Sequence, residues 1–563
     1  MAIRPYLPLL LLLFLGGCAF GDRDGSAADA SPQAAVATAH PEATDAAMAI
    51  LDDGGNAFDA AVSAAAVLGV TEPYSAGMGG GGFWLLQPAA GEPVMVDARE
   101  TAPGAAHPDM YLDEDGQPLD GRPSLNGPLA AGIPGQPASF VHIVEGYGVL
   151  DLDTTLARAI ELARDGIEVD ERYHRLAGFR AEVMKEDPET RRIYLDGGDQ
   201  APEPGTLIVQ SALADTLEAL AQDGLYGFYR GPVAEALVAD VQEAGGIWTL
   251  EDLERYHLIE RQPVRIPFGE AEILTTPAPS SGGIALAQMF GMLAHQPAPA
   301  SGVERTHHLV EVMRRAYHDR AYHLGDPAYH DIPRAQLLDP EYLATQADSI
   351  DPEQATASDS LTGLGSEGPH TTHLSVVDSD GNRVSATLTI NYPFGAGVTS
   401  PQTGILLNNE MDDFSIKPGE PNAYGLIGGE ANQVEAGKRP LSSMTPAILT
   451  TPERVTVLGT PGGSRIITMN FLGLLASLEG QSAEEVVALP RFHHQYRPDE
   501  IQHEPDTFSD ADKATLESLG HRLKNVERTF GNMQVIHTDR ATGRSEAASD
   551  PRGVGSARVR EQD

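Results

Sequence analysis

Cysteine is almost absent from this chain. Cys18 is the only cysteine among 563 residues. Because a lone cysteine cannot form an internal disulfide, a fold held together by disulfide bonds is excluded. Stability must therefore come from burial of apolar groups, and a chain of this length can build a large core.

Basic residues are also scarce. Lys and Arg number 38 against 81 Asp and Glu, which gives a formal net charge of −43. Binding to phosphate backbones or to anionic bilayers needs clustered positive charge, so nucleic acid and membrane surfaces are disfavoured as partners. The excess of acid favours a strongly hydrated surface of the kind suited to high salt.

Long apolar runs are confined to the N-terminus. Residues 1–18 carry one positive charge and a short run of leucines, a pattern that predicts a secretory signal and is too short for a membrane span. The segment ends in LGGC at Cys18, which resembles the lipobox of bacterial lipoproteins. We therefore expect lipidation of Cys18, a flexible tether over residues 19–35, and a periplasmic protein whose only membrane contact is the lipid. The alternative is an ordinary signal peptide with a chance cysteine.

Several strings that look like cofactor or metal motifs lack the context or the spacing that such sites need. Gly77, Gly79 and Gly82 match G-x-G-x-x-G, but a helix precedes them and a strand follows, the reverse of a dinucleotide site. These glycines predict a buried turn at which two backbones approach closely. The histidines of HDRAYH at 318–323 and of HH at 493–494 do not have the spacing of zinc ligands.

The rest of the chain predicts helices layered on antiparallel sheets. From about Val36 to Val70, apolar residues recur at helical spacing, which indicates two packed helices separated by the turn DDGGN. Residues 136–260, 304–324 and 333–350 also have helical patterns, whereas 371–391, 454–460 and 531–538 are rich in strand formers. No internal repeat divides the chain.

Residues 372–391 predict a β-hairpin with Asp380 and Gly381 at its tip. A two-residue turn pairs Thr371 with Ile390 and places it on the face opposite Thr389. A register shifted by one residue, with Gly381 in the left-handed region, brings Thr371 level with Thr389 or Asn391. The sequence alone leaves both registers open.

Thr371 stands at the start of this hairpin, in the string GPHTTH. A threonine hydroxyl is a poor nucleophile unless a base lies beside it, and a free α-amine on the same residue is such a base. That amine has an ordinary pKa of about 7.7–8.0. Thr371 is internal, so the His370–Thr371 bond would first have to be cut.

Several motifs together resemble the γ-glutamyltranspeptidases, which are N-terminal nucleophile hydrolases. They occur in the family's order from about residue 36 to 553, and they are DGGNAFDAAV at 53–62, DARETAP at 97–103, PSSGG at 279–283, TTHLSVVDSDGN at 371–382, NNEMDDF at 408–414, KRPLSSMTP at 438–446, PGGSRI at 461–466, PRFHHQ at 490–495 and SDPR at 549–552.

The resemblance implies a four-layer αββα sandwich of the α+β class. It also implies a precursor that cleaves itself into a large subunit, residues 36–370, and a small subunit, residues 371–563. In that scheme the Thr371 hydroxyl attacks the carbonyl of His370, and hydrolysis of the resulting ester frees the α-amine.

The resemblance also assigns roles in substrate binding. Arg99 with Ser442 and Ser443 is expected to bind a carboxylate, since a guanidinium fork and hydroxyl donors suit its oxygens. An α-ammonium group is expected to bind the acceptor oxygens of Asn391, Glu410 and Asp413. Where some bacterial relatives have Gln, this chain has Glu410.

The remaining expected roles concern catalysis and access. Gly462 and Gly463 resemble the oxyanion hole, in which backbone N–H groups face the developing negative charge. Thr389 is expected to orient the nucleophile. Residues 417–432 look like a lid loop that some members carry, with Tyr424 as its latch to Asn391.

The implied function is that of a γ-glutamyltransferase and glutathione hydrolase. Glutathione and other γ-glutamyl compounds would be donors, water or the amine of an amino acid or dipeptide would be the acceptor, and no metal or organic cofactor would be needed. One alternative is an acylase of the same superfamily that removes glutaryl-type side chains from β-lactams. The other is a non-catalytic envelope lipoprotein, against which the intact Thr371 and glycine pair argue.

Overall fold

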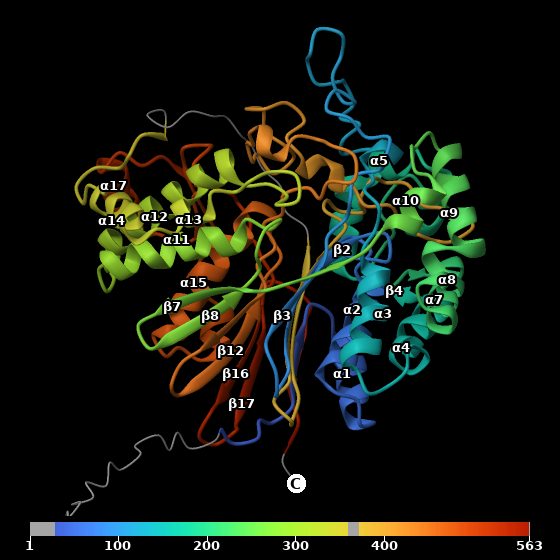
Figure 1. The fold of residues 1–563 in the computed structure, drawn as a ribbon, viewed down its shortest axis with the longest axis horizontal. Helices are drawn as coiled ribbons and strands as arrows, with labels where there is room; N and C mark the ends of the chain where they lie inside the picture. The colour runs from blue at the N-terminus through green and yellow to red at the C-terminus, as the bar shows by residue number, and fades with distance from the viewer. Residues whose placement is uncertain (1–28, 359–370, 562–563) are drawn as a thin grey trace, which may run out of the picture.

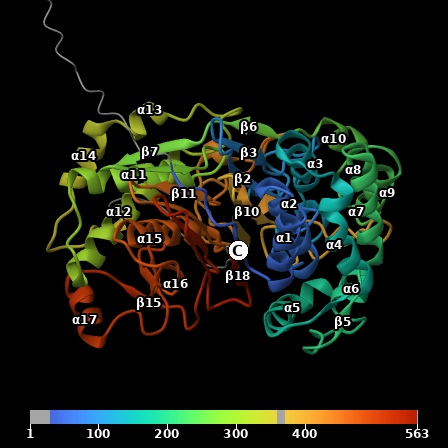
Figure 2. The same ribbon diagram turned by 90° about the horizontal axis from the view of Figure 1, so that it is seen from below.

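The computed structural model describes residues 29–358 and 371–561. Two β-sheets lie face to face, and a layer of helices covers the outer face of each (Figure 1; Figure 2). The expected four-layer αββα sandwich is therefore confirmed.

The first sheet is antiparallel and has seven strands. In spatial order they are β18 (Ser556–Val559), β1 (Ala35–Thr38), β9 (Thr372–Val377), β10 (Arg383–Thr389), β2 (Gly81–Gln87), β3 (Val94–Ala98) and β6 (Ile259–Arg261). The third and fourth strands of this order, β9 and β10, form the predicted hairpin, so the candidate nucleophile stands just before the end of an inner strand.

The second sheet is antiparallel and has six strands. In spatial order they are β17 (Ser545–Ser549), β16 (Gln534–Asp539), β12 (Arg454–Gly459), β11 (Ala447–Thr450), β8 (Ala271–Thr275) and β7 (Val264–Phe268). Two small sheets lie outside the sandwich: β13 (Phe492–His493), β14 (Ile501–His503) and β15 (Leu523–Asn525) form one, and β4 (Ile167–Glu168) and β5 (Leu207–Ile208) form the other.

The helices divide between the two outer layers (Figure 2). On the side of the first sheet lie α1 (Pro41–Asp52), α2 (Ala57–Thr71), α3 (Gln136–Tyr147), α4 (Leu152–Asp165), α5 (Glu171–Met184), α6 (Pro188–Tyr194), α7 (Ser211–Asp223), α8 (Tyr226–Tyr229), α9 (Gly231–Glu243) and α10 (Leu250–Arg255). On the side of the second sheet lie α11 (Gly282–His295), α12 (Gly302–His323), α13 (Arg334–Leu337), α14 (Pro340–Asp348), α15 (Ile466–Leu478), α16 (Ala483–Val487) and α17 (Asp510–Ser518).

Alternation along the strands builds a separate core on each face of the first sheet. Leu374 and Val376 of β9 face the helices, whereas Val377 faces the second sheet, where it joins Phe83 and Ile448. Toward the other end of β9 and β10, the residues that face the second sheet become polar. The space between the sheets is thus apolar at the hairpin tip and polar near Thr371.

The structure settles the register of the hairpin. Thr372 pairs with Leu388 and Val377 pairs with Arg383, which places Thr371 level with Thr389. The shift comes from a three-residue loop, in which Gly381 has a φ of +98° and the Asp378 carboxylate accepts hydrogen bonds from the backbone N–H groups of residues 380–382.

The glycine-rich turn is confirmed, and one helix boundary is corrected. A Cβ on Gly79 would lie 2.1 Å from the Leu406 carbonyl oxygen, and one on Gly80 would lie 2.0 Å from that of Thr389. The helical pattern expected from Val36 begins only at Pro41, because Ala35–Thr38 form β1. Four apolar residues cannot distinguish helix from strand, and pairing with β9 and β18 decides the outcome.

Among the helices in residues 29–358 and 371–561, none combines the length and apolar content needed to span a bilayer.

Candidate active site

Thr371, the candidate nucleophile, lines a pocket at one end of the sandwich. The pocket encloses about 310 Å³, counting the part open to solvent. It is lined by Arg99, Arg320, Thr371, Thr389, Asn391, Glu410, Asp413, Tyr424, Leu426, Ser442, Ser443, Met444, Gly463, Ser464 and Ile466. Residues from both parts of the chain, before and after His370, therefore meet around Thr371.

The two threonines of the hairpin, Thr371 and Thr389, lie side by side in the pocket lining. The hydroxyl oxygens of Thr371 and Thr389 are 3.5 Å apart. The Thr389 oxygen also accepts a hydrogen bond from the backbone N–H of Asn391, at 2.7 Å. Because that bond occupies an acceptor position, the Thr389 hydroxyl proton is free to point at Thr371, which is the orienting role expected for it.

The PGGS segment turns at the pocket, which Gly463 and Ser464 line together with Thr371. Gly462 has a φ of +152° and Gly463 a φ of +54°, both in the region that favours glycine. A Cβ on Gly462 would lie 2.3 Å from the Met469 methyl group. The short 3₁₀ helix Gly463–Arg465 then leads into α15, so the backbone N–H groups at this turn form a helix N-terminus that favours negative charge.

The Arg99 guanidinium is bound by carboxylates on the opposite wall. Its Nη1 donates to Glu410 and its Nη2 to Asp413, the latter at 2.5 Å. Its Nε donates to the Pro440 carbonyl oxygen at 3.1 Å. In this structure Arg99 is therefore ion-paired with two of the residues expected to bind an ammonium group.

More carboxylates than cations lie around Arg99. Glu100 also lies 3.5 Å from Arg99, so three carboxylates surround one guanidinium. Burial raises the pKa of Glu410 and of Asp413, and it raises the pKa of Glu100 to about 7. A further positive charge in the pocket would offset that excess, and a substrate ammonium group carries one.

The serine pair lies on the other side of the pocket, held by the PSSGG segment. Ser280 Oγ donates to the Met444 carbonyl at 2.6 Å, and Ser281 Oγ donates to the Ser442 carbonyl at 2.7 Å. Ser442 Oγ accepts a hydrogen bond from the Met444 backbone N–H. Its hydroxyl proton therefore remains available to a ligand.

Tyr424 closes one side of the pocket. Its hydroxyl donates to the Asn391 carbonyl oxygen at 2.6 Å, and only 4% of the residue is exposed. Gln495 Nε2 donates to the Tyr424 carbonyl oxygen at 3.3 Å. The expected contact with Asn391 is therefore present, through the backbone carbonyl of that residue.

The structure brings together nearly all of the expected site residues. Gly462 is absent from the lining but directly precedes Gly463, which is part of it. Cys18 and His370 lie outside the described residues. Arg320 is a lining residue that the sequence did not predict; it lies in the string HDRAYH, in which only the histidines suggest a site.

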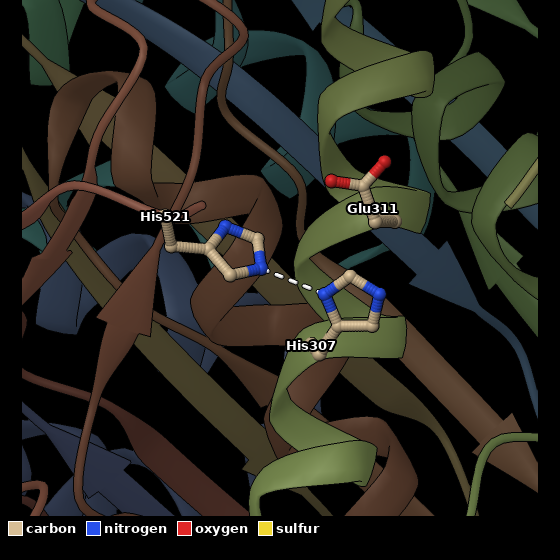
Figure 3. A group of neighbouring side chains, drawn as sticks. All are labelled: His307, Glu311 and His521. Carbon is tan, nitrogen blue, oxygen red and sulfur yellow. Dashed lines mark hydrogen bonds between the residues drawn. The ribbon is translucent and has the colours of Figure 1, made fainter. Parts of the chain in front are cut away.

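One group with metal-ligand chemistry occurs in the described part of the chain, away from the pocket lining. His307 and Glu311 of α12 lie beside His521, with one ligand atom of each within 4.8 Å of the others (Figure 3). His307 Nδ1 and His521 Nε2 are 2.7 Å apart, and the Glu311 carboxylate accepts hydrogen bonds from Arg314 and Arg315. Glu311 is thus paired with arginines, and the group forms part of the buried structure.

The tautomers of the two histidines follow from their partners. His307 Nε2 must donate to the Asp351 carbonyl, which can only accept, so His307 Nδ1 accepts from His521. His521 Nδ1 is then a bare lone pair, which agrees with its lack of a partner among the described residues. The cluster holds the segment that follows Ile350 against α12.

Comparison with known proteins identifies the family. The family model described as Gamma-glutamyltranspeptidase matches residues 43–559. Glutathione hydrolase proenzyme of Escherichia coli (strain K12) is 39% identical over 536 residues, which cover 93% of this chain and 91% of that protein. The corresponding protein of Pseudomonas aeruginosa is 40% identical over 517 residues, with 90% and 91% covered.

A solved structure agrees with the fold. Cephalosporin acylase from Bacillus halodurans superposes with a TM-score of 0.83 at 25% identity, covering 98% of this chain and 100% of that one. The match to the family model spans the second sheet, the first sheet except β1, and every residue that lines the pocket. The chain belongs to the gamma-glutamyltranspeptidase family.

Proposed function

We propose that this chain is a glutathione hydrolase and γ-glutamyltransferase that uses Thr371 as its nucleophile. The E. coli and P. aeruginosa relatives, at 39% and 40% identity, are glutathione hydrolases by name. The observation that carries the proposal is the pocket itself. Its lining brings Thr371 together with carboxylates and with serine hydroxyls, groups suited to the charges of a zwitterionic acyl donor.

Maturation precedes catalysis in this proposal. The Thr371 oxygen attacks the His370 carbonyl carbon, the C–N bond between the two residues breaks, and the peptide becomes an ester on Thr371. Water then hydrolyses that ester, which leaves a carboxylate on His370 and a free α-amine on Thr371. The new amine supplies the base that the hydroxyl needs.

Acyl transfer then follows in two steps. The α-amine takes the Thr371 hydroxyl proton as the oxygen attacks the γ-carbonyl carbon of the donor, and the proton passes to the leaving amine as the amide C–N bond breaks. Water, or the amine of an amino acid or dipeptide, attacks the resulting γ-glutamyl ester and regenerates Thr371. The chain's own residues supply every proton transfer in this scheme.

The tetrahedral intermediate of each step carries an oxyanion. In the proposal it lies against the backbone N–H groups at Gly462 and Gly463, beside the N-terminus of α15. Loss of one such donor typically costs about 3 kcal/mol of transition-state stabilisation. A side chain at either glycine would require a strained backbone, since both have positive φ.

The acylase alternative has one observation in its favour. The Bacillus halodurans cephalosporin acylase shares the fold with a TM-score of 0.83. A glutaryl-type substrate has a carboxylate but no ammonium group, so it leaves the excess of carboxylates around Arg99 without a partner. We therefore favour the γ-glutamyl donor.

We also propose a periplasmic protein anchored through a lipid on Cys18. β1 begins at Ala35, which pairs with Val377, whereas the candidate nucleophile precedes the other end of β9. The tether therefore joins the end of the sandwich opposite the pocket.

The proposed activity is tested with purified wild-type protein and two variants. Incubation with glutathione should release glutamate and cysteinylglycine. With an added dipeptide, the product should be that dipeptide carrying a γ-glutamyl group on its amine. Thr371→Ala should abolish both products, whereas Thr371→Ser keeps a hydroxyl nucleophile and should retain measurable turnover. Full activity of Thr371→Ala would disprove the proposed nucleophile.

A further inference from the structure

A second guanidinium lines the pocket. Arg320 belongs to α12, on the side of the second sheet, and only 4% of it is exposed. Its Nε donates to Ser281 Oγ at 3.0 Å and its Nη2 donates to Ser443 Oγ at 3.3 Å. Both partners are neutral hydroxyls.

The charge on Arg320 lacks a direct counter-ion within the described residues. No described carboxylate forms an ion pair with it, and burial lowers its pKa, with Tyr317 and Asp413 acting in the opposite direction. A buried charge without an ion pair is costly to the fold. In proteins such perturbed groups cluster at functional sites, where a bound anion can supply the missing partner.

Arg320 also fixes the direction in which Ser443 can donate. The Ser443 oxygen accepts a hydrogen bond from Arg320, so its own proton is free to point into the pocket. The guanidinium polarises that O–H group and makes it a better donor to an anion. Arg320 also donates to Ser281 Oγ, which in turn donates to the Ser442 carbonyl oxygen.

The two guanidinium groups of the pocket therefore differ in what surrounds them. Arg99 donates to Glu410 and Asp413, on the acidic wall. Within the described residues, the Arg320 side chain donates hydrogen bonds only to hydroxyls, on the serine wall. Of the two guanidinium groups, that of Arg320, beside Ser443, is thus the one without an ion-pair partner among the described residues.

We propose that Arg320 is a positioning residue of the carboxylate subsite, which acts through Ser443 by orienting its hydroxyl and by supplying positive charge behind it. The proposal rests on the proposed binding of a γ-glutamyl zwitterion in this pocket. It predicts that Arg320 affects donors with an α-carboxylate and spares donors without one.

Two donors isolate this effect. The γ-glutamyl anilide carries both charged groups, whereas the 4-aminobutanoyl anilide keeps the amine and lacks the α-carboxylate. For Arg320→Gln we expect KM for the first donor to rise roughly 10–100-fold, the range for loss of a hydrogen bond to a charged group, with a smaller change in kcat. The second donor should change less than about threefold in kcat/KM.

A double-mutant cycle tests the route through Ser443. In a Ser443→Ala background, Arg320→Gln should add little further loss on the γ-glutamyl donor, because the group through which it acts is gone. Arg320→Lys, which keeps the charge but not the fork, should fall between wild type and Arg320→Gln and serves if the latter does not fold. Arg315→Gln, on the same helix but bound to Glu311, is the matched control and should not discriminate between the donors.

Three results would overturn the inference: equal losses on both donors, additive losses in the cycle, or unchanged KM for the γ-glutamyl donor in both Arg320 variants. Failure of the proposed function gives a different result, because wild-type protein would then not turn over the γ-glutamyl donor.

Discussion

At the scale of single residues, carboxylates outnumber the guanidinium on the acidic wall of the pocket. Glu100, Glu410 and Asp413 all lie within 3.5 Å of Arg99, and one guanidinium cannot offset three carboxylates. Burial raises the pKa of Glu410 and Asp413 because few water molecules can stabilise their charged forms. A substrate ammonium group entering this wall would share those carboxylates with Arg99.

The first prediction concerns Asp413, whose carboxylate is expected to bind that ammonium group. Asp413→Ala should lower kcat/KM for γ-glutamyl donors about 30-fold or more, as removal of one partner from a buried charge pair does. Glutaryl donors, which lack the ammonium group, should lose much less. Asp413→Asn keeps the size of the side chain and is the control for packing. Equal losses on both donor types would show that Asp413 does not recognise the charge.

At the scale of elements, residues 417–429 pack onto the pocket as a structured loop. The Tyr424 hydroxyl bonds to the Asn391 carbonyl at 2.6 Å, and the Ala423 N–H donates to the Asp412 carboxylate at 2.7 Å. The Gly429 N–H donates to the carbonyl of Ala321 in α12 at 2.9 Å. The loop therefore joins the acidic wall to the helix that carries Arg320.

The second prediction is that this loop governs substrate choice without taking part in bond making. Deletion of residues 417–429 should leave self-cleavage intact while it changes KM and widens the range of large γ-glutamyl donors. Tyr424→Phe removes only the bond to Asn391 and should give a smaller change of the same kind. Unchanged kinetics on small and polymeric γ-glutamyl donors after the deletion would make the segment a passive surface loop.

The sequence predicts most of these elements, and its failures have physical causes. The hairpin of β9 and β10 follows from alternation, but its register depends on the loop at Gly381, which alternation does not determine. Ala35–Thr38 is too short to show a period, so only pairing reveals β1. Arg320 was missed because nothing local distinguishes a pocket arginine from others on a long helix.

At the scale of the whole molecule, buried neutral histidines lie within the sandwich. His373 of β9 is fully buried, with its ring nitrogens 2.9 Å from Thr387 Oγ1 and 3.3 Å from Ser375 Oγ. Burial lowers its pKa to about 3, and it likewise lowers the pKa of His537 in the second sheet to about 3. Such groups remain uncharged in the folded protein at neutral pH.

The third prediction is a loss of stability in mild acid. Between pH 6.5 and 3 the unfolded chain protonates these histidines and the folded chain does not, so their contribution is complete above pH 6.5 and declines as the pH falls. Each group can contribute a slope of about 1.4 kcal/mol per pH unit. Urea unfolding from pH 8 to pH 5 measures it, and His373→Asn should lessen the slope. A slope in His373→Asn equal to that of the wild type would contradict the prediction.

The central claim is that the chain becomes an enzyme by cutting itself before Thr371, the residue that then lies level with Thr389 at the pocket. Intact-mass measurement with N-terminal sequencing of purified wild-type protein tests it most directly. We predict two chains, the smaller beginning at Thr371, and for Thr371→Ala one uncut, inactive chain. A wild-type protein that remains one chain and hydrolyses glutathione at its full rate would contradict the account.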